Sequence, residues 1–270
     1  MTRSFLAAQI RAKGSYLCVG LDTDLEKIPK HLQQDPDAIF LFNKQIIDAT
    51  LDHCVSYKIN TAFYEAMGAR GWEIMERTFQ YIPSTHFKIA DAKRGDIGNT
   101  SSQYARAFFE TMKADAITVA PYMGEDSVKP FLAYKDKWTI VLGLTSNKGA
   151  KDFELQDAGG EKLYEKVLRT VSGWGNPENL MFVVGATQAD EFINIRKICP
   201  EHFFLVPGVG AQGGSLRDIS QKALIPDGGI LVNASRAIIY ASEKEDFATE
   251  AKIIAEQYQV EMRGYLEDRR

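Results

Sequence analysis

Eight short apolar runs, rich in β-branched residues, recur along the whole chain and constrain its fold more than any other feature. Most of them are nearly continuous rather than alternating in polarity, which is typical of parallel strands that are covered on both faces. They read YLCVGLD from Tyr16, CVSYKIN from Cys54, HFKIADAK from His86, AITVAP from Ala116, WTIVLGLT from Trp138, NLMFVVGAT from Asn179, HFFLVPGVG from His202 and GILVNAS from Gly229. The sequence therefore predicts eight buried parallel strands.

Segments with a helical spacing of apolar residues separate these runs. Successive runs begin about 22 to 41 residues apart, which is the size of a unit made of one strand and one helix. The helical segments include AIFLFNKQIIDATL, GWEIMERTFQYI, TSSQYARAFFETMKA, EKLYEKVLRTVSGW and residues 246–267. No Pro/Ser-rich or low-complexity linker divides the 270 residues. We therefore predict an α/β fold in which residues 1–270 form a single (β/α)8 TIM barrel. An open, doubly wound sheet is the alternative.

Charge and cysteine content narrow the classes of function. A net charge of −4 argues against a nucleic-acid partner but leaves room for a local basic pocket that binds a phosphate. Cys18, Cys54 and Cys199 are widely spaced, as expected of buried thiols in a cytosolic protein. The histidines form no metal-binding pattern, and no signal sequence or membrane-spanning apolar run is present. We expect a soluble, cytoplasmic protein with no membrane partner.

Polar residues follow most of the apolar runs at the point where each predicted strand ends. In a barrel these ends meet at one rim, which is where substrates bind. The residues are Asp22, Lys58, Asp91, Lys93, Ser146, Gln212 and Arg236. Their repetition around the rim predicts an active site there.

The segment from Ile89 to Thr100, IADAKRGDIGNT, holds the densest group of charges. Because side chains alternate along a strand, Asp91 and Lys93 should point to the same side, next to Lys58 from the preceding strand. Asp96 follows after a turn-like Arg-Gly pair. Such an array suits a reaction in which a carboxylate leaves and a carbanion is protonated. Lysine stabilises the negative charge and donates the proton, while aspartate holds the lysine in place. This chemistry needs no cofactor or metal.

The pattern DxKxxDI with a nearby threonine resembles the signature of orotidine 5'-phosphate decarboxylases. The chain is most similar to the longer bacterial (type 2) subfamily, which has DAKRGDIG. Matching pieces run in order along nearly the whole chain: VGLD, YKIN, DAKRGDIGNT, APYMGEDS, LTSNKGAKDF, PGVGAQGG and NASRAIIYA. The resemblance implies a carboxy-lyase that converts orotidine 5'-phosphate to UMP and CO2 without a cofactor. It also implies a homodimer with shared active sites.

The resemblance assigns roles to individual residues. Lys93 matches the proton donor, Asp91 its catalytic partner, and Lys58 the lysine that ends the second strand. Asp22 matches the residue that binds the ribose hydroxyls. The residues that would enter the partner subunit's site are Asp96, Ile97 and Thr100.

Two positions depart from the pattern of the longer subfamily. Ile59 stands where proline is common, and Ala120 stands where asparagine is common. Neither change removes a catalytic charge, so the activity that the resemblance implies is unaffected.

The loops after the fifth, seventh and eighth strands carry residues suited to a nucleotide. A serine hydroxyl with exposed backbone amides can read the edge of a pyrimidine, and the resemblance gives this role to Ser146. Glycines in the segment that begins at Pro207 let backbone N–H groups approach an anion. The planar guanidinium of Arg236, next to Ser235, can hold a phosphate, and the family's phosphate-binding residues match Arg236 and Gln212.

Three other interpretations are open at this point. Gly208, Gly210 and Gly213 form GxGxxG, but a dinucleotide site would need this motif early in a βαβ unit with an acidic residue about 20 positions later. A related barrel could be a Mg²⁺-dependent sugar-phosphate decarboxylase or aldolase, with Asp91 as a metal ligand. A non-catalytic barrel that binds a phosphorylated ligand would not need the charged array. The set formed by Lys58, Asp91, Lys93 and Asp96 favours the decarboxylase.

Overall fold

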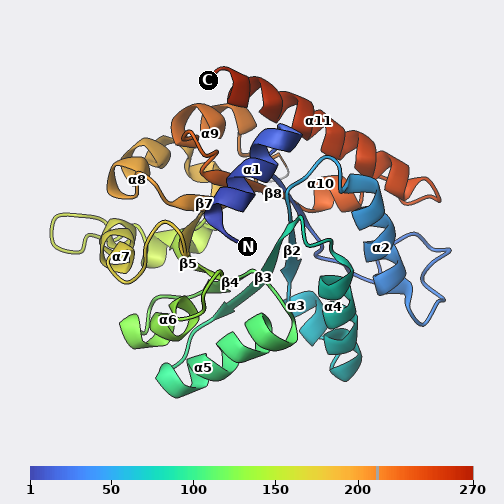
Figure 1. Ribbon diagram of the computed structural model, residues 1–270, viewed down its shortest axis with the longest axis horizontal. Coiled ribbons are helices and arrows are strands. Elements are labelled where there is room, and N and C mark those ends of the chain that lie inside the picture. The colour runs from blue at the N-terminus through green and yellow to red at the C-terminus, as the bar shows by residue number, and fades with distance from the viewer. Residues whose placement is uncertain (211–212, 270) are drawn as a thin grey trace.

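The computed structural model describes residues 1–210 and 213–269 and contains a closed, parallel β-barrel. Its strands follow the order of the sequence, and β8 pairs with β1 to complete the circle (Figure 1). The strands are β1 (Leu17–Gly20), β2 (Ser56–Asn60), β3 (Phe87–Arg94), β4 (Ala116–Val119), β5 (Trp138–Leu144), β6 (Leu180–Val184), β7 (Phe203–Pro207) and β8 (Ile230–Ala234). Each falls within one of the eight apolar runs, except that β3 extends one residue beyond its run, so the predicted (β/α)8 TIM barrel is confirmed.

Helices surround the barrel, and the predicted helical segments are among them. These are α2 (Ala38–Thr50), α4 (Ala69–Tyr81), α5 (Gly98–Arg106), α7 (Leu163–Ser172) and α11 (Phe247–Glu267). The segment that contains α5 continues as a π-helical turn, η1 (Ala107–Thr111). The remaining helices and 3-10 turns are α3 (Ala62–Glu65), α6 (Glu125–Leu132), η2 (Lys148–Asp152), η3 (Ala186–Glu191), α8 (Phe192–Ile198), α9 (Leu216–Ala223) and α10 (Arg236–Ile239). No helix in the part of the chain that the structure describes is long and apolar enough to cross a membrane.

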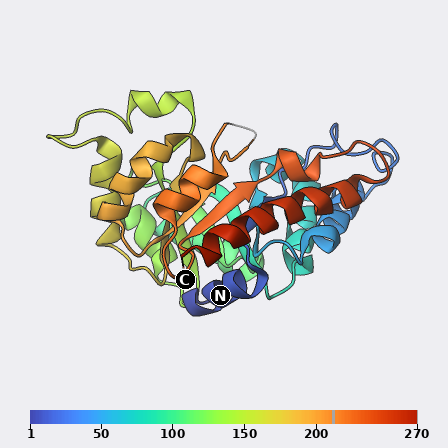
Figure 2. The same cartoon turned by 90° about the horizontal axis from the view of Figure 1, so that it is seen from above.

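Helix α1 (Arg3–Lys13) precedes the first strand and, like the remaining helices, was not among the segments named from the sequence. The Thr2 side chain caps its start by accepting the Phe5 N–H, and Gly14 ends it with a left-handed φ of 59°. It lies at the end of the barrel where the strands begin, because the Trp138 Nε1–H at the start of β5 donates to the Met1 carbonyl. Figure 2 shows α1 on the same side of the molecule as both chain ends. The opposite rim is left for the functional loops.

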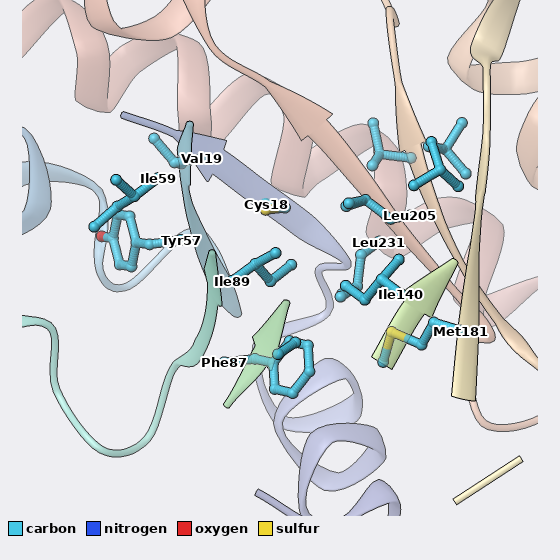
Figure 3. Packing of buried hydrophobic residues seen from close by; sticks show 14 of the residues in the cluster. Cys18, Val19, Tyr57, Ile59, Phe87, Ile89, Ile140, Met181, Leu205 and Leu231 are labelled. Atoms are coloured by element: carbon cyan, nitrogen blue, oxygen red, sulfur yellow. The ribbon is translucent and has the colours of Figure 1, made fainter. Parts of the chain in front are cut away.

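Strand alternation divides the apolar residues between two layers of core. Val19, Tyr57 and Ile59 point outward to the helices, while a second group points into the barrel (Figure 3). The second group includes Cys18, Phe87, Ile89, Ile140, Met181, Leu205 and Leu231. All ten side chains are at most 2% exposed. Ile59, one of the two departures from the subfamily pattern, is therefore an ordinary core residue. The three cysteines are free and buried.

Regular alternation stops near the end of β3. Ala90 pairs with Ile117 of β4, but the next pair is Arg94 with Val119, so residues 91–93 all lie opposite the single residue Thr118. Lys93 has a left-handed φ of 48°, which is uncommon for a residue other than glycine. This is a β-bulge, a feature that redirects side chains next to active sites. The strand does run through Lys93, as predicted, but the regular alternation that was used to place Asp91 and Lys93 on one side is interrupted there.

Candidate active site

Four charged side chains from three neighbouring segments form a continuous row at the rim. The Lys58 Nζ of β2 lies 3.0 Å from the Asp22 Oδ1, just beyond β1, and 3.0 Å from the Asp91 Oδ2 of β3. The Lys93 Nζ lies 2.7 Å from the Asp91 Oδ1. Lys58 is 3% exposed, whereas the Lys93 side chain is 51% exposed and faces open space. The predicted proximity of Lys58, Asp91 and Lys93 is confirmed.

The two central members of the row, Lys58 and Asp91, are held in their charged states. Burial lowers the pKa of Lys58, but the carboxylates of Asp91 and Asp22 outweigh burial and raise it above its ordinary value. Burial raises the pKa of Asp91, and the ammonium groups of Lys58 and Lys93 reverse this and hold it well below the usual range. Asp91 is therefore a carboxylate and Lys58 an ammonium at neutral pH.

A threonine that the sequence analysis missed completes this row. The Thr118 Oγ1 of β4 donates to the Asp91 Oδ1 at 3.0 Å and accepts the Lys93 backbone N–H at 2.9 Å. Thr118 is the one hydroxyl residue in the apolar run AITVAP. This signal is weak, because threonine is also common as an ordinary β-branched residue of a buried strand.

A cavity of about 160 Å³ joins the charged row to the loops that follow β7 and β8. Its walls are formed by Asp22, Lys58, Asn60, Asp91, Pro207, Gly208, Val209, Asn233, Ala234, Ser235, Arg236 and Ala237. Six of the predicted site residues therefore surround one space: Asp22, Lys58, Asp91, Pro207, Ser235 and Arg236. Asn60 and Asn233 are additions that the sequence analysis missed, since both lie within strands that otherwise read as core.

The loops after β7 and β8 give one side of this cavity an exposed positive charge. Arg236 is exposed and makes no ion pair within residues 1–210 and 213–269. Gly208 and Gly210, with φ of 96° and 71°, give the loop after β7 a backbone conformation that other residues rarely adopt. The Asn233 Oδ1 is buried without a hydrogen-bond partner among the described residues. Arg236 supplies positive charge to a space that adjoins the Asp–Lys row.

Glycine is required where β1 reaches the rim. A Cβ atom at Gly20 would lie 1.7 Å from the Ser235 Oγ, so a larger residue would displace Ser235 from the cavity wall. A Cβ atom at Gly185 would lie 2.6 Å from the Ser146 backbone N, so glycine must follow β6 directly for the loop after β5 to pack against it. Local sequence motifs thus reflect close approaches between distant segments.

The other predicted site residues that the structure describes do not line this cavity. Lys93 is one of them, and it adjoins the cavity through its contact with Asp91. Ser146 lies beyond the end of β5, against Gly185. Asp96, Ile97 and Thr100 lie at the start of α5, where the Asp96 Oδ1 accepts the Ile97 N–H. No ion pair joins Asp96 to the lysines of its own chain in the portion of the structure that is described. Gln212 lies outside the described residues.

The described residues contain no group of three or more His, Cys, Asp or Glu side chains that could hold a metal ion. The carboxylates of Asp22 and Asp91 instead face lysine ammonium groups. A barrel that places such a row beside an arginine and a glycine-rich loop defines an enzyme that acts on a small, phosphorylated anion.

Comparison with known proteins identifies the family. Residues 15–251 match the family described as orotidine 5'-phosphate decarboxylase / HUMPS, and the chain belongs to that family. An orotidine 5'-phosphate decarboxylase of Parabacteroides distasonis is 57% identical over 273 residues, which cover 100% of this chain and 98% of the relative. One from Bacteroides fragilis is 56% identical over 266 residues, covering 97% of each. The solved Leishmania donovani OMP decarboxylase is 36% identical, with a TM-score of 0.83 over 98% of this chain and 99% of that one.

These full-length matches confirm the resemblance seen in the sequence motifs. The chain decarboxylates orotidine 5'-phosphate and is a carboxy-lyase of pyrimidine biosynthesis. The dinucleotide interpretation of the GxGxxG segment is thereby replaced.

Proposed function

We propose that the row of lysines and aspartates carries out this decarboxylation without a metal or organic cofactor. The carbon–carbon bond to the carboxylate breaks, CO2 leaves, and the electron pair stays on the pyrimidine carbon. The Lys93 ammonium stabilises that charge and transfers its proton to the carbon, which gives UMP. The contact that supports this role most directly is the 2.7 Å pair between Lys93 and Asp91, because it fixes the ammonium at the open end of the row.

The cavity supports a placement for the rest of the nucleotide. We assign the phosphate to Arg236 and the loop that contains Gly208, and Gln212 belongs to the same proposal. The ribose would then lie beside Asp22, with Pro207 and Ser235 in the same wall. The pyrimidine would extend toward Ser146 at the end of β5. Orotidine 5'-phosphate and UMP are the substrate and product in this proposal.

Metal independence is tested by exhaustive treatment with EDTA. We expect the rate of absorbance loss from orotidine 5'-phosphate to be unchanged, because the Asp91 carboxylate is neutralised by two lysines and needs no cation. Addition of Mg²⁺ to the treated enzyme is the control. A loss of turnover that Mg²⁺ restores would favour the sugar-phosphate type of mechanism and contradict the proposal.

We further propose a homodimer in which Asp96, Ile97 and Thr100 complete the site of the partner subunit. The apolar side chain of Ile97 is 60% exposed. Tyr122, in the loop after β4, is 91% exposed. The start of α5 lies next to the start of α6, since a Cβ atom at Gly98 would be 3.7 Å from the Asp126 carbonyl oxygen. Exposed apolar side chains gathered at a rim are typical of an interface between subunits.

Mixing two inactive variants tests the shared site. Lys93→Ala removes the proton donor, and Asp96→Ala removes the residue that is offered to the partner, so each homodimer should be nearly inactive. Random exchange makes half of the dimers mixed, and each mixed dimer has one intact site. Recovered activity should therefore approach about a quarter of the parent value. If demonstrated subunit exchange restores no activity, Asp96 acts within its own chain.

Two further points, the extent of the catalytic domain and its place in the cell, complete the proposal. We propose that residues 1–270 act as one catalytic domain and that the enzyme is cytoplasmic. The second point rests on three cysteines that are free and buried, as is usual in a reducing compartment. Fractionation of cells that produce the chain tests it, and recovery outside the cytoplasm would contradict it.

A further inference from the structure

The bulge at the end of β3 leaves the Lys93 backbone N–H without the acceptor that a regular ladder would supply. Three residues of β3 lie opposite Thr118 of β4, and Lys93 has its left-handed φ within this stretch. A side chain takes over the missing role, because the Thr118 Oγ1 accepts the Lys93 N–H at 2.9 Å. The Thr118 hydroxyl therefore stabilises the backbone conformation that carries the proposed proton donor.

The direction of the second hydrogen bond of Thr118 follows from the first. A backbone N–H can only donate, so the hydroxyl oxygen is the acceptor there, and its own hydrogen is available for the Asp91 Oδ1 at 3.0 Å. The same Asp91 oxygen accepts from the Lys93 Nζ at 2.7 Å. These three contacts close a ring that runs from the Lys93 backbone through Thr118 and Asp91 to the Lys93 ammonium.

We propose that Thr118 is a positioning residue, which sets the place of the Lys93 ammonium through this ring. The inference rests on the proposed role of Lys93 as proton donor. The Lys93 side chain is half exposed and has four rotatable bonds, so its Asp91 contact alone leaves its stem free to move. Thr118 restrains the other end of that stem, at the backbone. A proton transfer depends steeply on such placement, whereas binding of UMP does not.

Replacement of Thr118 by valine removes both hydrogen bonds and keeps the shape of the side chain. Thr139 of β5 is the matched control, since it is also a fully buried threonine in a neighbouring strand. Its Oγ1 has no hydrogen-bond partner among the described residues. The parent, Thr118→Val, Thr118→Ser and Thr139→Val are compared for kcat and KM with orotidine 5'-phosphate and for UMP affinity by calorimetry.

The loss of hydrogen bonds to a carboxylate and to a strained backbone should lower kcat of Thr118→Val by about tenfold to a hundredfold. KM and UMP affinity should change by less than about threefold, because Thr118 does not line the cavity. Thr118→Ser retains the hydroxyl and should recover most of kcat. Thr139→Val should behave as the parent.

Three results would overturn the inference. They are a kcat of Thr118→Val within about twofold of the parent, a loss expressed only in KM, and a Thr118→Ser enzyme more than about tenfold slower than the parent. The serine variant keeps the test decisive even if the valine variant does not fold. A Lys93→Ala enzyme with turnover within about tenfold of the parent would instead count against the proposed role of Lys93.

Discussion

Replacement of Lys58 by methionine should lower stability and abolish turnover together. The Lys58 Nζ is buried and lies 3.0 Å from a carboxylate oxygen on each side. With an effective dielectric constant of about 20, each contact is worth about 5 kcal/mol before the cost of burying the charges. Removal of one partner from a buried ion pair typically costs about 3 to 5 kcal/mol, because it leaves uncompensated charge. We expect a loss of that size in the free energy of unfolding of Lys58→Met at pH 7.

The same substitution should change the dependence of stability on pH. In the parent, the folded pKa of Asp91 lies well below its unfolded value, so its contribution to stability is complete above about pH 4 and is lost only as the pH falls through that low folded pKa. Without Lys58, burial has less opposition and raises the pKa of Asp91. The buried carboxylate can then be neutralised by a proton at mildly acidic pH. The difference in stability between parent and variant should therefore shrink from pH 7 to pH 4.5.

Urea unfolding followed by circular dichroism at both pH values measures these effects. Lys88→Met is the control, because Lys88 is a half-buried lysine of β3 whose Nζ donates to the Phe79 carbonyl at 3.0 Å. Its loss should cost only about 1 kcal/mol and leave turnover intact. The reasoning is refuted if Lys58→Met costs no more than Lys88→Met, or if its cost is the same at pH 7 and pH 4.5.

Two further substitutions probe other parts of the molecule. Arg236→Ala should weaken UMP binding by about tenfold to a hundredfold through loss of charge-assisted phosphate contacts, with little change in stability because the side chain is exposed. Unchanged UMP affinity in calorimetry would place the phosphate elsewhere. Burial and the neighbouring Arg196 and Arg3 lower the pKa of His202 to about 4, so the folded state loses stability relative to the unfolded state as the pH falls from about 6.5 to 4. His202→Phe should remove up to about 3 kcal/mol of this acid-induced loss, measured by urea unfolding at pH 7 and pH 4, and an unaltered pH dependence would contradict the assignment.

The sequence alone was sufficient for the barrel and for most of the charged row. Nearly continuous apolar runs specify strands buried on both faces, and their spacing leaves room for one helix between each pair. Lys58 and Asp91 lie within such runs, where an unpaired charge would be costly, so their presence already indicated a shared site. Gly208 likewise reflects a local requirement, a positive φ of 96°, that a sequence pattern can show.

Tertiary structure alone decided which polar residues meet. Period-two alternation placed Asp91 and Lys93 on one side, but they meet through a bulge and a left-handed lysine, which depend on the register with β4. Thr118 became part of the site only because that register brings its hydroxyl to the bulge. Asp96 could not be placed against the lysines of its own chain from sequence distance alone, since the turn after Lys93 carries it to the start of α5. Periodicity is a property of one strand, whereas hydrogen-bond partners across a sheet are set by how two strands align.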